Sequence, residues 1–192
     1  MPTLYYIRHG QTDWNAQLRF QGQQDIPLNE TGRAQARDNG ARLAGLLGAA
    51  SGIDFVASPL GRARETMEIV RSAMGLEPAR YRIDPRLIEA SYGTLEGTTL
   101  PQFKAQFPDV HRRRKLERWT FQPPQGESHK MVLDRVLPWL AEIERDSVVV
   151  AHGVIGRVLR LHLIGGDPDA AASYPFPQDR VLVWRDGVET VV

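Results

Sequence analysis

Two histidines of this chain stand at the ends of apolar runs. His9 follows residues 4–7 and Arg8, and His152 follows residues 147–151. Neither run alternates apolar with polar side chains, which is typical of strands covered on both faces in a parallel sheet. Ligands of open α/β sheets bind beyond the carboxyl ends of the strands, so we expect both imidazoles at one site.

A third apolar run, residues 53–57, leads into Ser58, Pro59 and Arg62. Ser58 suits an N-cap and Pro59 the first helical position, so the pattern predicts a helix that starts there and ends near residue 74. Arg62 then lies in the first turn, beside free N–H groups and the positive end of the helix dipole. The alternative is a distant carboxylate partner for Arg62. An anion held jointly by the arginine and the helix end is the better physical account, and we expect it.

Parallel neighbouring strands would bring Arg8, His9, Arg62 and His152 to one edge of the sheet. Such a cluster favours an anion, and planar guanidinium groups favour phosphate or carboxylate. A neutral imidazole is a competent nucleophile toward phosphorus, and nearby cations lower its pKa and keep its lone pair free. The same cations would stabilise a transferring phosphoryl group without a metal. This chemistry predicts a phosphohistidine intermediate that is then hydrolysed.

The leaving group of such a transfer needs a proton. Glu89 is the nearby carboxyl group in the loop that follows the second helix, and we expect it to act first as general acid and then as general base. Glu96 belongs to the same glycine-punctuated loop and is expected to be solvated, as loop glutamates usually are.

Composition restricts the class of protein. The 192 residues are enough for one domain with a sizeable core. The 24 Lys and Arg balance 23 Asp and Glu, so the overall charge favours neither nucleic acid nor a membrane as a partner. The chain has no cysteine, which excludes disulfides, thiolate nucleophiles and Cys-ligated metals. It shows no signal sequence and no apolar stretch of 18 residues, so we expect a soluble, cytoplasmic protein.

Local patterns predict the elements around these groups. Residues 11–24 are polar and without helical periodicity, so we expect a loop. Asn29 can cap a helix over residues 30–47, which ends at a glycine. Residues 77–84 predict a further strand.

Two more elements are expected toward the C-terminus. A helix that follows Ser128 should pack an apolar face that includes Met131 and Val132. Asp186 and Gly187, between two apolar runs, predict a type I′ hairpin at a sheet edge.

Residues 98–125 differ in character from the rest of the chain. Four prolines interrupt them, and they contain a dense basic run at residues 111–115. They hold too few apolar residues for a core of their own, so we expect a short helical excursion, or lid, on a single domain of residues 1–192. The basic run could bind nucleic acid. A solvated helix face, or a contribution to recognising a polyanionic substrate, agrees better with the balanced overall charge.

The chain resembles a known family, the histidine phosphatase superfamily in its phosphoglycerate-mutase-like branch. The resemblance rests on these motifs, which occur in the family's order over nearly the whole chain: Arg8-His9-Gly10 with Thr12 and Asn15, Gln21-Gly22, Leu28-Asn29-Glu30-Thr31-Gly32, Ser58-Pro59-Leu60-Gly61-Arg62-Ala63 with Thr66, Leu87-Ile88-Glu89 with Gly93 and Glu96-Gly97, Gly126-Glu127-Ser128, and Val149-Val150-Ala151-His152-Gly153. Each motif alone is weak, but the ordered set is specific.

The resemblance implies a three-layer α/β/α sandwich with a mostly parallel central sheet. It also implies a small phosphorylated substrate, with His9 as the phosphorylated nucleophile and Glu89 as the proton donor. The other implied site residues are Arg8, Arg62 and His152, which would bind the phosphoryl group, and Asn15, Gln21, Gly22 and the Gly153 backbone, which would line the site. No metal or other cofactor is expected.

Two departures from the family pattern bear on the reaction. Gly153 is followed by Val154 instead of a second glycine. The segment that cofactor-dependent mutases insert before the Gly-Glu-Ser motif is missing, because Pro124 almost adjoins Gly126. Water should then reach a phosphohistidine easily, which favours a phosphatase over a phosphoglycerate mutase. A catalytically silent phosphate-binding module is opposed by the intact reactive residues, and the sequence leaves both the substrate and the oligomeric state open.

Overall fold

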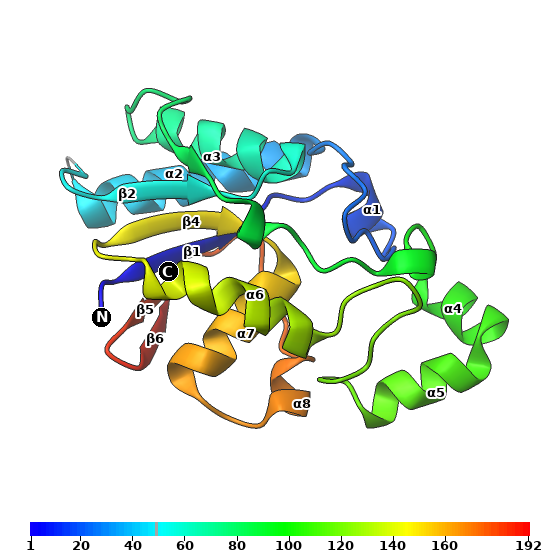
Figure 1. The fold of residues 1–192 in the computed structure, drawn as a ribbon. Helices are drawn as coiled ribbons and strands as arrows, with labels where there is room; N and C mark the ends of the chain where they lie inside the picture. Colours follow the sequence, from blue (N-terminus) through cyan, green and yellow to red (C-terminus); the bar gives the residue numbers. More distant parts are fainter. Residues whose placement is uncertain (49) are drawn as a thin grey trace.

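A six-stranded sheet forms the centre of the computed structural model, which describes residues 1–48 and 50–192 (Figure 1). Its strands are β1 (Leu4–Arg8), β2 (Asp54–Ala57), β3 (Arg82–Ile83), β4 (Ser147–Ala151), β5 (Leu182–Arg185) and β6 (Val188–Val191). They lie in the order β3-β2-β4-β1-β5-β6. The pairs from β3 to β1 are parallel, and β5 is antiparallel to both β1 and β6.

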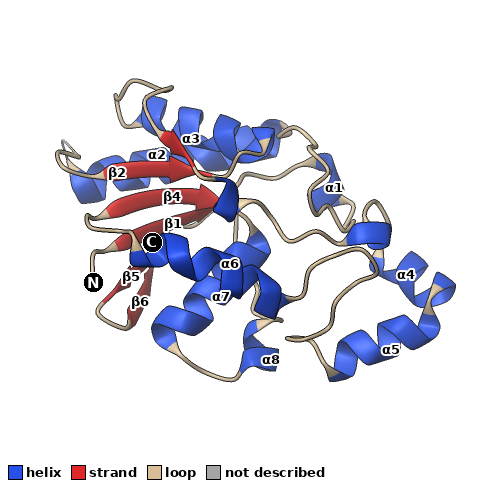
Figure 2. Cartoon of the chain, viewed as in Figure 1, coloured by secondary structure: helices blue, strands red, loops and turns tan. Residues whose placement is uncertain are grey.

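Helices cover both faces of this sheet. The α-helices of the described residues are α1 (Asp13–Ala16), α2 (Glu30–Leu47), α3 (Gly61–Ala73), α4 (Leu100–Gln106), α5 (Pro108–Leu116), α6 (His129–Ala141), α7 (Gly153–Ile164) and α8 (Pro168–Ala171). In Figure 1, α2 and α3 lie on one face and α6 and α7 on the other, so the predicted three-layer α/β/α sandwich is confirmed. Figure 2 shows α1, α4 and α5 beyond the carboxyl ends of the parallel strands, joined by long loops. No helix in the described part of the chain has the length and apolarity needed to cross a membrane.

The two helix layers explain why the central strands are apolar throughout. Tyr5 and Ile7 of β1 belong to the core cluster under α2 and α3. Leu4 and Tyr6, which point to the opposite face, belong to the cluster under α6 and α7. Successive side chains of a strand alternate between faces, so a strand that is buried on both faces needs apolar residues at every position.

The predicted α2 and the predicted hairpin are both confirmed. Asn29 caps α2, its side chain accepting from the N–H of Gly32 at 2.9 Å, and the helix ends before Gly48. β5 and β6 are joined by Asp186 and Gly187, whose φ angles of 49° and 76° are the two positive values that a type I′ turn requires. β6 forms an edge of the sheet, as expected.

Two other expectations are wrong in part. Residues 11–24 include α1, which Thr12 and Asn15 cap reciprocally; this helix is too short for periodicity and buries no residue. The strand expected over residues 77–84 is reduced to β3, which pairs only with β2 at the other edge of the sheet.

α6 buries a narrower face than predicted. Val132, Val136 and Leu140 are buried at a spacing of four residues, whereas Met131 is 41% exposed. One residue along a helix turns the side chain by about 100°, which takes Met131 off the buried stripe.

A glycine lets α7 approach β1 closely. A Cβ atom on Gly156 would lie 2.5 Å from the ring of Phe176 and 2.9 Å from the ring of Tyr6. The two rings make an edge-to-face contact, with centroids 5.4 Å apart. The carbonyl oxygen of Phe176 accepts a hydrogen bond from Arg8 at 2.8 Å. Packing at Gly156 therefore helps to position the first arginine of the site.

Candidate active site

The parallel hydrogen-bond ladder continues past the ends of the central strands. The N–H of His9 donates to the carbonyl of Ala151 at 2.9 Å, and the N–H of Ser58 donates to that of Val150 at 3.0 Å. His9, Ser58 and His152 therefore follow three neighbouring strands and lie together at the carboxyl ends of those strands. The rings of His9 and His152 have centroids 5.1 Å apart, which confirms that the two histidines meet.

His9 is held in a single tautomer. Its Nδ1 lies 2.8 Å from the carbonyl oxygen of Gly10, and because a carbonyl only accepts, Nδ1 carries the proton. The lone pair of the neutral ring is then on Nε2, 3.3 Å from Nε of Arg62. Burial holds the pKa of His9 well below its usual value, and the charges of Arg62 and Arg8 lower it further. We expected the cations to lower this pKa; burial contributes more than they do.

Arg62 is anchored on the neighbouring loop. Only 1% of it is exposed, and it donates to the carbonyl oxygens of Gly22 and Gln24, both at 2.7 Å. The side-chain amide of Gln21 joins Arg62 to Thr12. Its NH₂ group donates to Oγ1 of Thr12 at 2.6 Å, and its oxygen accepts from Nε of Arg62 at 2.7 Å. Burial lowers the pKa of Arg62 to about 10, so the guanidinium stays charged at neutral pH.

The helix that carries Arg62 starts later than predicted. α3 begins at Gly61, so Ser58 is not its N-cap and Pro59 is not its first residue. Ser58 instead places its Oγ 2.6 Å from Nε2 of His152. The residue that meets the helix end is Asp25, whose carboxylate accepts from the N–H of Gly61 at 2.8 Å.

Asp25 also changes the expected role of this helix end. Arg62 lies in the first turn, as predicted, but its NH1 is 3.9 Å from Oδ1 of Asp25. The anion at the N-terminus of α3 is thus a side chain of the protein. The expectation that the helix end and Arg62 hold a ligand together is therefore wrong for the helix end.

Arg8 and His152 each keep a buried nitrogen without a partner among the described residues. These atoms are Nε of Arg8 and Nδ1 of His152. Burial lowers the pKa of both groups. A buried polar group without a hydrogen bond costs roughly 1–3 kcal/mol, and an anion bound between these residues would supply the acceptor.

Glu89 approaches from the loop after β3. Its carboxylate accepts from the N–H of Ala90 at 2.9 Å and from that of Val154 at 3.3 Å. Val154 is in the first turn of α7, where the helix dipole favours a negative charge. These bonds fix the carboxyl group beside Gly153.

A cavity of about 130 Å³, here called the His9 cavity, joins these groups. Eight of the nine predicted site residues line it: Arg8, His9, Asn15, Gln21, Gly22, Arg62, Glu89 and Gly153. His152, the ninth, is fully buried and does not line it. One water occupies about 30 Å³ of liquid, so the cavity has room for a tetrahedral oxyanion. Within residues 1–48 and 50–192, no group of three or more His, Cys, Asp or Glu residues is arranged to hold a metal ion.

Four further residues that the sequence analysis missed line the His9 cavity. They are Arg19, Phe20, Tyr92 and Arg157. Arg157 lies four residues after Gly153 on α7, and this spacing, which puts both on one helix face, could have identified it. Arg19 and Phe20 follow α1 in a loop, and no pattern in the sequence marks them.

Glu96 connects two loops of the site and is not simply solvated, as expected. Its carboxylate accepts from the N–H groups of Gln23 at 3.0 Å and Tyr92 at 3.1 Å. The close fit explains Gly22, which has a φ of +54° and where a Cβ atom would lie 2.1 Å from Oε1 of Glu96.

A segment near the C-terminus, residues 174–178, forms hydrogen bonds to several site residues. The carbonyl of Phe176 accepts from Arg8, and that of Tyr174 accepts from Arg157 at 2.8 Å. Gln178 donates to the carbonyl of His9 at 2.9 Å and to Oδ1 of Asn15 at 3.0 Å. This support was not predicted, because the segment carries no motif.

Comparison with known proteins assigns the chain to a family. A model of the histidine phosphatase superfamily (branch 1) matches residues 4–185, and the chain belongs to this superfamily. It is 33% identical over 178 residues to a Bacillus subtilis (strain 168) protein named uncharacterized phosphatase PhoE, a match that covers 90% of this chain and 83% of the relative. It is 32% identical over 201 residues to a 2,3-bisphosphoglycerate-dependent phosphoglycerate mutase of Azorhizobium caulinodans, a match that covers 98% of this chain and 94% of the relative.

A solved structure shows the same fold. Mycobacterial glucosyl-3-phosphoglycerate phosphatase in complex with VO3 matches with a TM-score of 0.79 and 32% identity, over 95% of this chain and 92% of that chain. Phosphatases and mutases are thus both among the relatives of this protein.

The buried histidines predict a loss of stability in mild acid. His9 and His152 have folded-state pKa values below the ordinary 6.5, so below that pH the unfolded chain binds protons that the folded chain does not. Their contribution is complete above pH 6.5 and is lost as the pH falls, by about 1.4 kcal/mol per pH unit for each histidine. Urea unfolding between about pH 7.5 and pH 5 measures this slope.

His152→Asn should make the slope shallower. His162→Asn, at an exposed histidine of α7, is the matched control and should leave it unchanged. A slope that is the same in His152→Asn and in the native protein would contradict the assignment of neutral, buried imidazoles.

Proposed function

We propose that this protein is a metal-independent phosphatase that hydrolyses small phosphomonoesters through a phosphohistidine at His9. The observation that carries the proposal is the neutral ring of His9, with its proton fixed on Nδ1 and its lone pair on Nε2, 3.3 Å from Arg62. A nucleophile in that state beside a permanent cation is suited to attack an anionic phosphoryl group.

In the first step, Nε2 of His9 attacks phosphorus and the ester P–O bond breaks. The carboxyl group of Glu89 donates its proton to the departing alkoxide, so an alcohol leaves and a carboxylate remains. Arg62, Nε of Arg8 and Nδ1 of His152 bind the phosphoryl oxygens. For His152 this requires Ser58 to donate its hydroxyl proton to Nε2, which leaves the proton of the neutral ring on Nδ1.

In the second step, water attacks the phosphohistidine and the P–N bond breaks. The Glu89 carboxylate accepts the proton of the attacking water, and inorganic phosphate leaves. His9 returns to its neutral form with the proton still on Nδ1. The positive charge that balances the phosphoryl oxygens comes from two arginines, which are charged at neutral pH without a bound metal.

A phosphoglycerate mutase is the second candidate. The Azorhizobium relative with that name is matched over 94% of its own length by 98% of this chain. This mutase therefore has no long insertion that the present chain lacks, and the absence of such an insertion does not argue against mutase activity. Hydrolysis is supported by the phosphatase structure that matches 95% of this chain. In our proposal residues 1–192 act as one domain, with residues 98–125 as a lid that selects the substrate.

The phosphohistidine can be trapped. Brief incubation with a radiolabelled phosphomonoester, followed by quenching in base, should leave acid-labile, base-stable label on His9, because a phosphoramidate resists base. His162→Asn is the control and should be labelled as the native protein is. Label on another residue, or full activity of His9→Ala, would refute the mechanism.

Glu89→Gln tests the proton donor through the leaving group. An alkoxide leaves poorly without a proton, so the burst of phosphoryl transfer from an alkyl phosphate should slow by roughly 10² to 10⁴-fold. A nitrophenolate leaves readily as the anion, and its burst should be far less affected. The burst is measured because it reports transfer to His9 apart from turnover. Equal slowing for both substrates would mean that Glu89 supports the loop and that another group donates the proton.

The partition between water and a second hydroxyl separates phosphatase from mutase. With 3-phosphoglycerate and a bisphosphoglycerate primer, inorganic phosphate should appear faster than 2-phosphoglycerate. Both products are followed in one reaction by NMR of phosphorus. Isomerisation that outruns phosphate release would make the mutase the better assignment.

A further inference from the structure

The loop that carries Glu89 is bound along its main chain by a side chain of α6. Arg135 donates from NH1 to the carbonyl oxygen of Arg86 and from NH2 to that of Ile88, the latter at 2.8 Å. The same NH2 group lies 3.3 Å from the carbonyl oxygen of Glu89. One guanidinium group thus holds three main-chain carbonyl groups of the short segment that ends at the proposed proton donor.

Glu127 binds both Arg135 and the same loop. Its two oxygens accept from Nε and NH2 of Arg135 at 2.9 and 3.2 Å. Its Oε2 also accepts from the N–H of Ser91 at 3.0 Å, and its own N–H donates to the carbonyl of Ser91 at 2.8 Å. The two side chains are called here the Arg135–Glu127 clamp, because together they hold residues 86–91.

The clamp is a charged pair that is mostly buried. The side chains of Arg135 and Glu127 are 23% and 19% exposed. Burial raises the pKa of Glu127, but the hydrogen bonds from Arg135 and from the N–H of Ser91 outweigh this effect and keep the pKa below its usual value. Glu127 is therefore a carboxylate at neutral pH, and it holds the guanidinium in one orientation.

These contacts require an arginine. Its planar guanidinium group directs Nε and NH2 toward a carboxylate while NH1 and the second hydrogen of NH2 reach other acceptors. A lysine has the same charge but a single nitrogen at its end, which cannot bind Glu127 and the carbonyls of Arg86 and Ile88 in the same geometry. A change to lysine therefore separates the charge of Arg135 from its geometry.

The segment around Glu127 approaches the loop closely. A Cβ atom on Gly126 would lie 2.6 Å from the carbonyl oxygen of Ser91. Ser128 then caps α6, and its side chain accepts from the N–H of Met131 at 3.2 Å. Each residue of the Gly-Glu-Ser motif, residues 126–128, thus has a part in joining α6 to the loop of Glu89.

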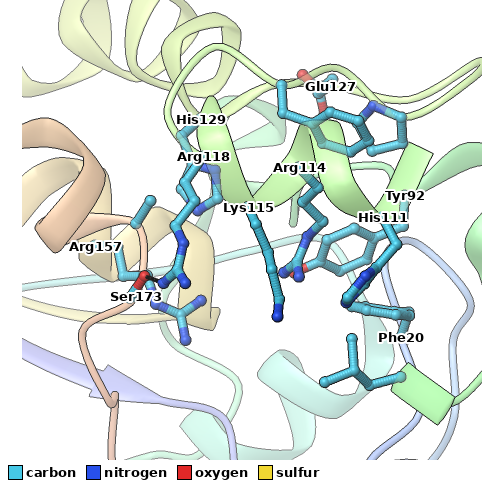
Figure 3. A pocket seen from close by; sticks show the side chains of 14 residues that line it. Phe20, Tyr92, His111, Arg114, Lys115, Arg118, Glu127, His129, Arg157 and Ser173 are labelled. Carbon is cyan, nitrogen blue, oxygen red and sulfur yellow. Dashed lines mark hydrogen bonds between the residues drawn. The ribbon is translucent and has the colours of Figure 1, made fainter. Parts of the chain in front are cut away.

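Glu127 is also part of the wall of a pocket of about 420 Å³, which shares three lining residues with the His9 cavity (Figure 3). Arginines line this pocket too, but within the part of the chain that the structure describes Glu127 forms its ion pair with Arg135 alone. Because both its oxygens are used by the clamp, Glu127 is directed at the loop of Glu89 and not at a ligand.

Glu89 is held at both ends by this arrangement. Its carbonyl oxygen, which the clamp contacts, also accepts from the side chain of Gln23 at 3.0 Å. Its carboxylate accepts from the N–H groups of Ala90 and Val154. A general acid must stay within hydrogen-bond reach of the leaving oxygen, and a misplacement of about 1 Å can cost about 10²-fold in rate. The position of this main chain therefore controls proton transfer.

We propose that Arg135 and Glu127 are positioning residues for proton transfer. Through the main chain of residues 86–91, they hold the carboxyl group of Glu89 where it can protonate the leaving oxygen. Neither side chain lines the His9 cavity, so both act through Glu89. This inference rests on the proposed function, in which Glu89 is the proton donor.

Arg135→Lys tests the geometry of the clamp while the charge is kept. With enzyme in excess over substrate, release of the alcohol from an alkyl phosphate should slow by about 10- to 100-fold, because a displaced carboxyl group protonates the alkoxide poorly. Release of nitrophenolate from 4-nitrophenyl phosphate should be nearly unchanged, since that group leaves as the anion. Glu127→Gln, which keeps one acceptor oxygen, should have the same effect by a smaller factor.

A double variant shows whether the clamp acts through Glu89. Adding Arg135→Lys to Glu89→Gln should slow the alkyl phosphate little further, because the group that the clamp positions is already gone. A role in the fold alone would slow both substrates, and its effect would multiply with that of Glu89→Gln.

Glu142→Gln is the matched control. Glu142 is exposed and accepts from the side chain of Arg86 at 2.6 and 2.7 Å, so this change also removes an ion pair of the same loop. It leaves the contacts of the clamp in place, and the ratio between the two substrates should stay that of the native protein. Thermal unfolding of each variant checks that the fold is retained.

The outcomes separate this inference from the proposed function. A native ratio between the two substrates in both Arg135→Lys and Glu127→Gln, or full multiplication of the effects in the double variant, would overturn the inference while Glu89→Gln still identifies the proton donor. If Glu89→Gln itself slows both substrates equally, the proton donor of the proposed function is wrong, and the inference fails with it.

Discussion

The parallel pairing of β1, β4 and β2 is the constraint on which the site depends. β1 and β2 each extend the ladder with β4 by one hydrogen bond beyond their ends, and these bonds fix His9 and Ser58 beside His152. Helix layers on both faces keep the three strands buried. A histidine fixed there has little freedom in its backbone, and its ring is set by one further bond to Gly10.

Burial has opposite effects on the two kinds of group in this site. It removes charge from the imidazole of His9, which leaves the lone pair of Nε2 free. It also lowers the pKa of Arg62, but to about 10, so that arginine remains a cation. A lysine in the same place has a lower intrinsic pKa and would lose its charge more readily, which accounts for the use of arginine. The buried carboxyl end of the sheet thus holds a neutral imidazole next to a permanent positive charge.

The sequence predicted this site better than its surroundings. The apolar runs that end at His9 and His152 mark strand ends directly, because a strand buried on both faces consists of consecutive apolar residues. The start of α3 was mispredicted, because Ser58 has the chemistry of an N-cap and only the position of His152 shows that its hydroxyl is used there. The contacts of Asp25, Gln178 and Arg157 join segments that are distant in sequence, which periodicity and local propensity do not encode.

The C-terminal support of the site has a consequence for synthesis of the chain. Gln178 and His9, which the support joins, are 169 residues apart, and Phe176 is similarly far from Arg8. During translation His9 is made long before residues 174–178, and β5, the antiparallel neighbour of β1, follows later still. Until residues 174–178 have been made, Arg8 and His9 lack their hydrogen bonds to this segment, so the site cannot adopt the arrangement that it has in the folded protein.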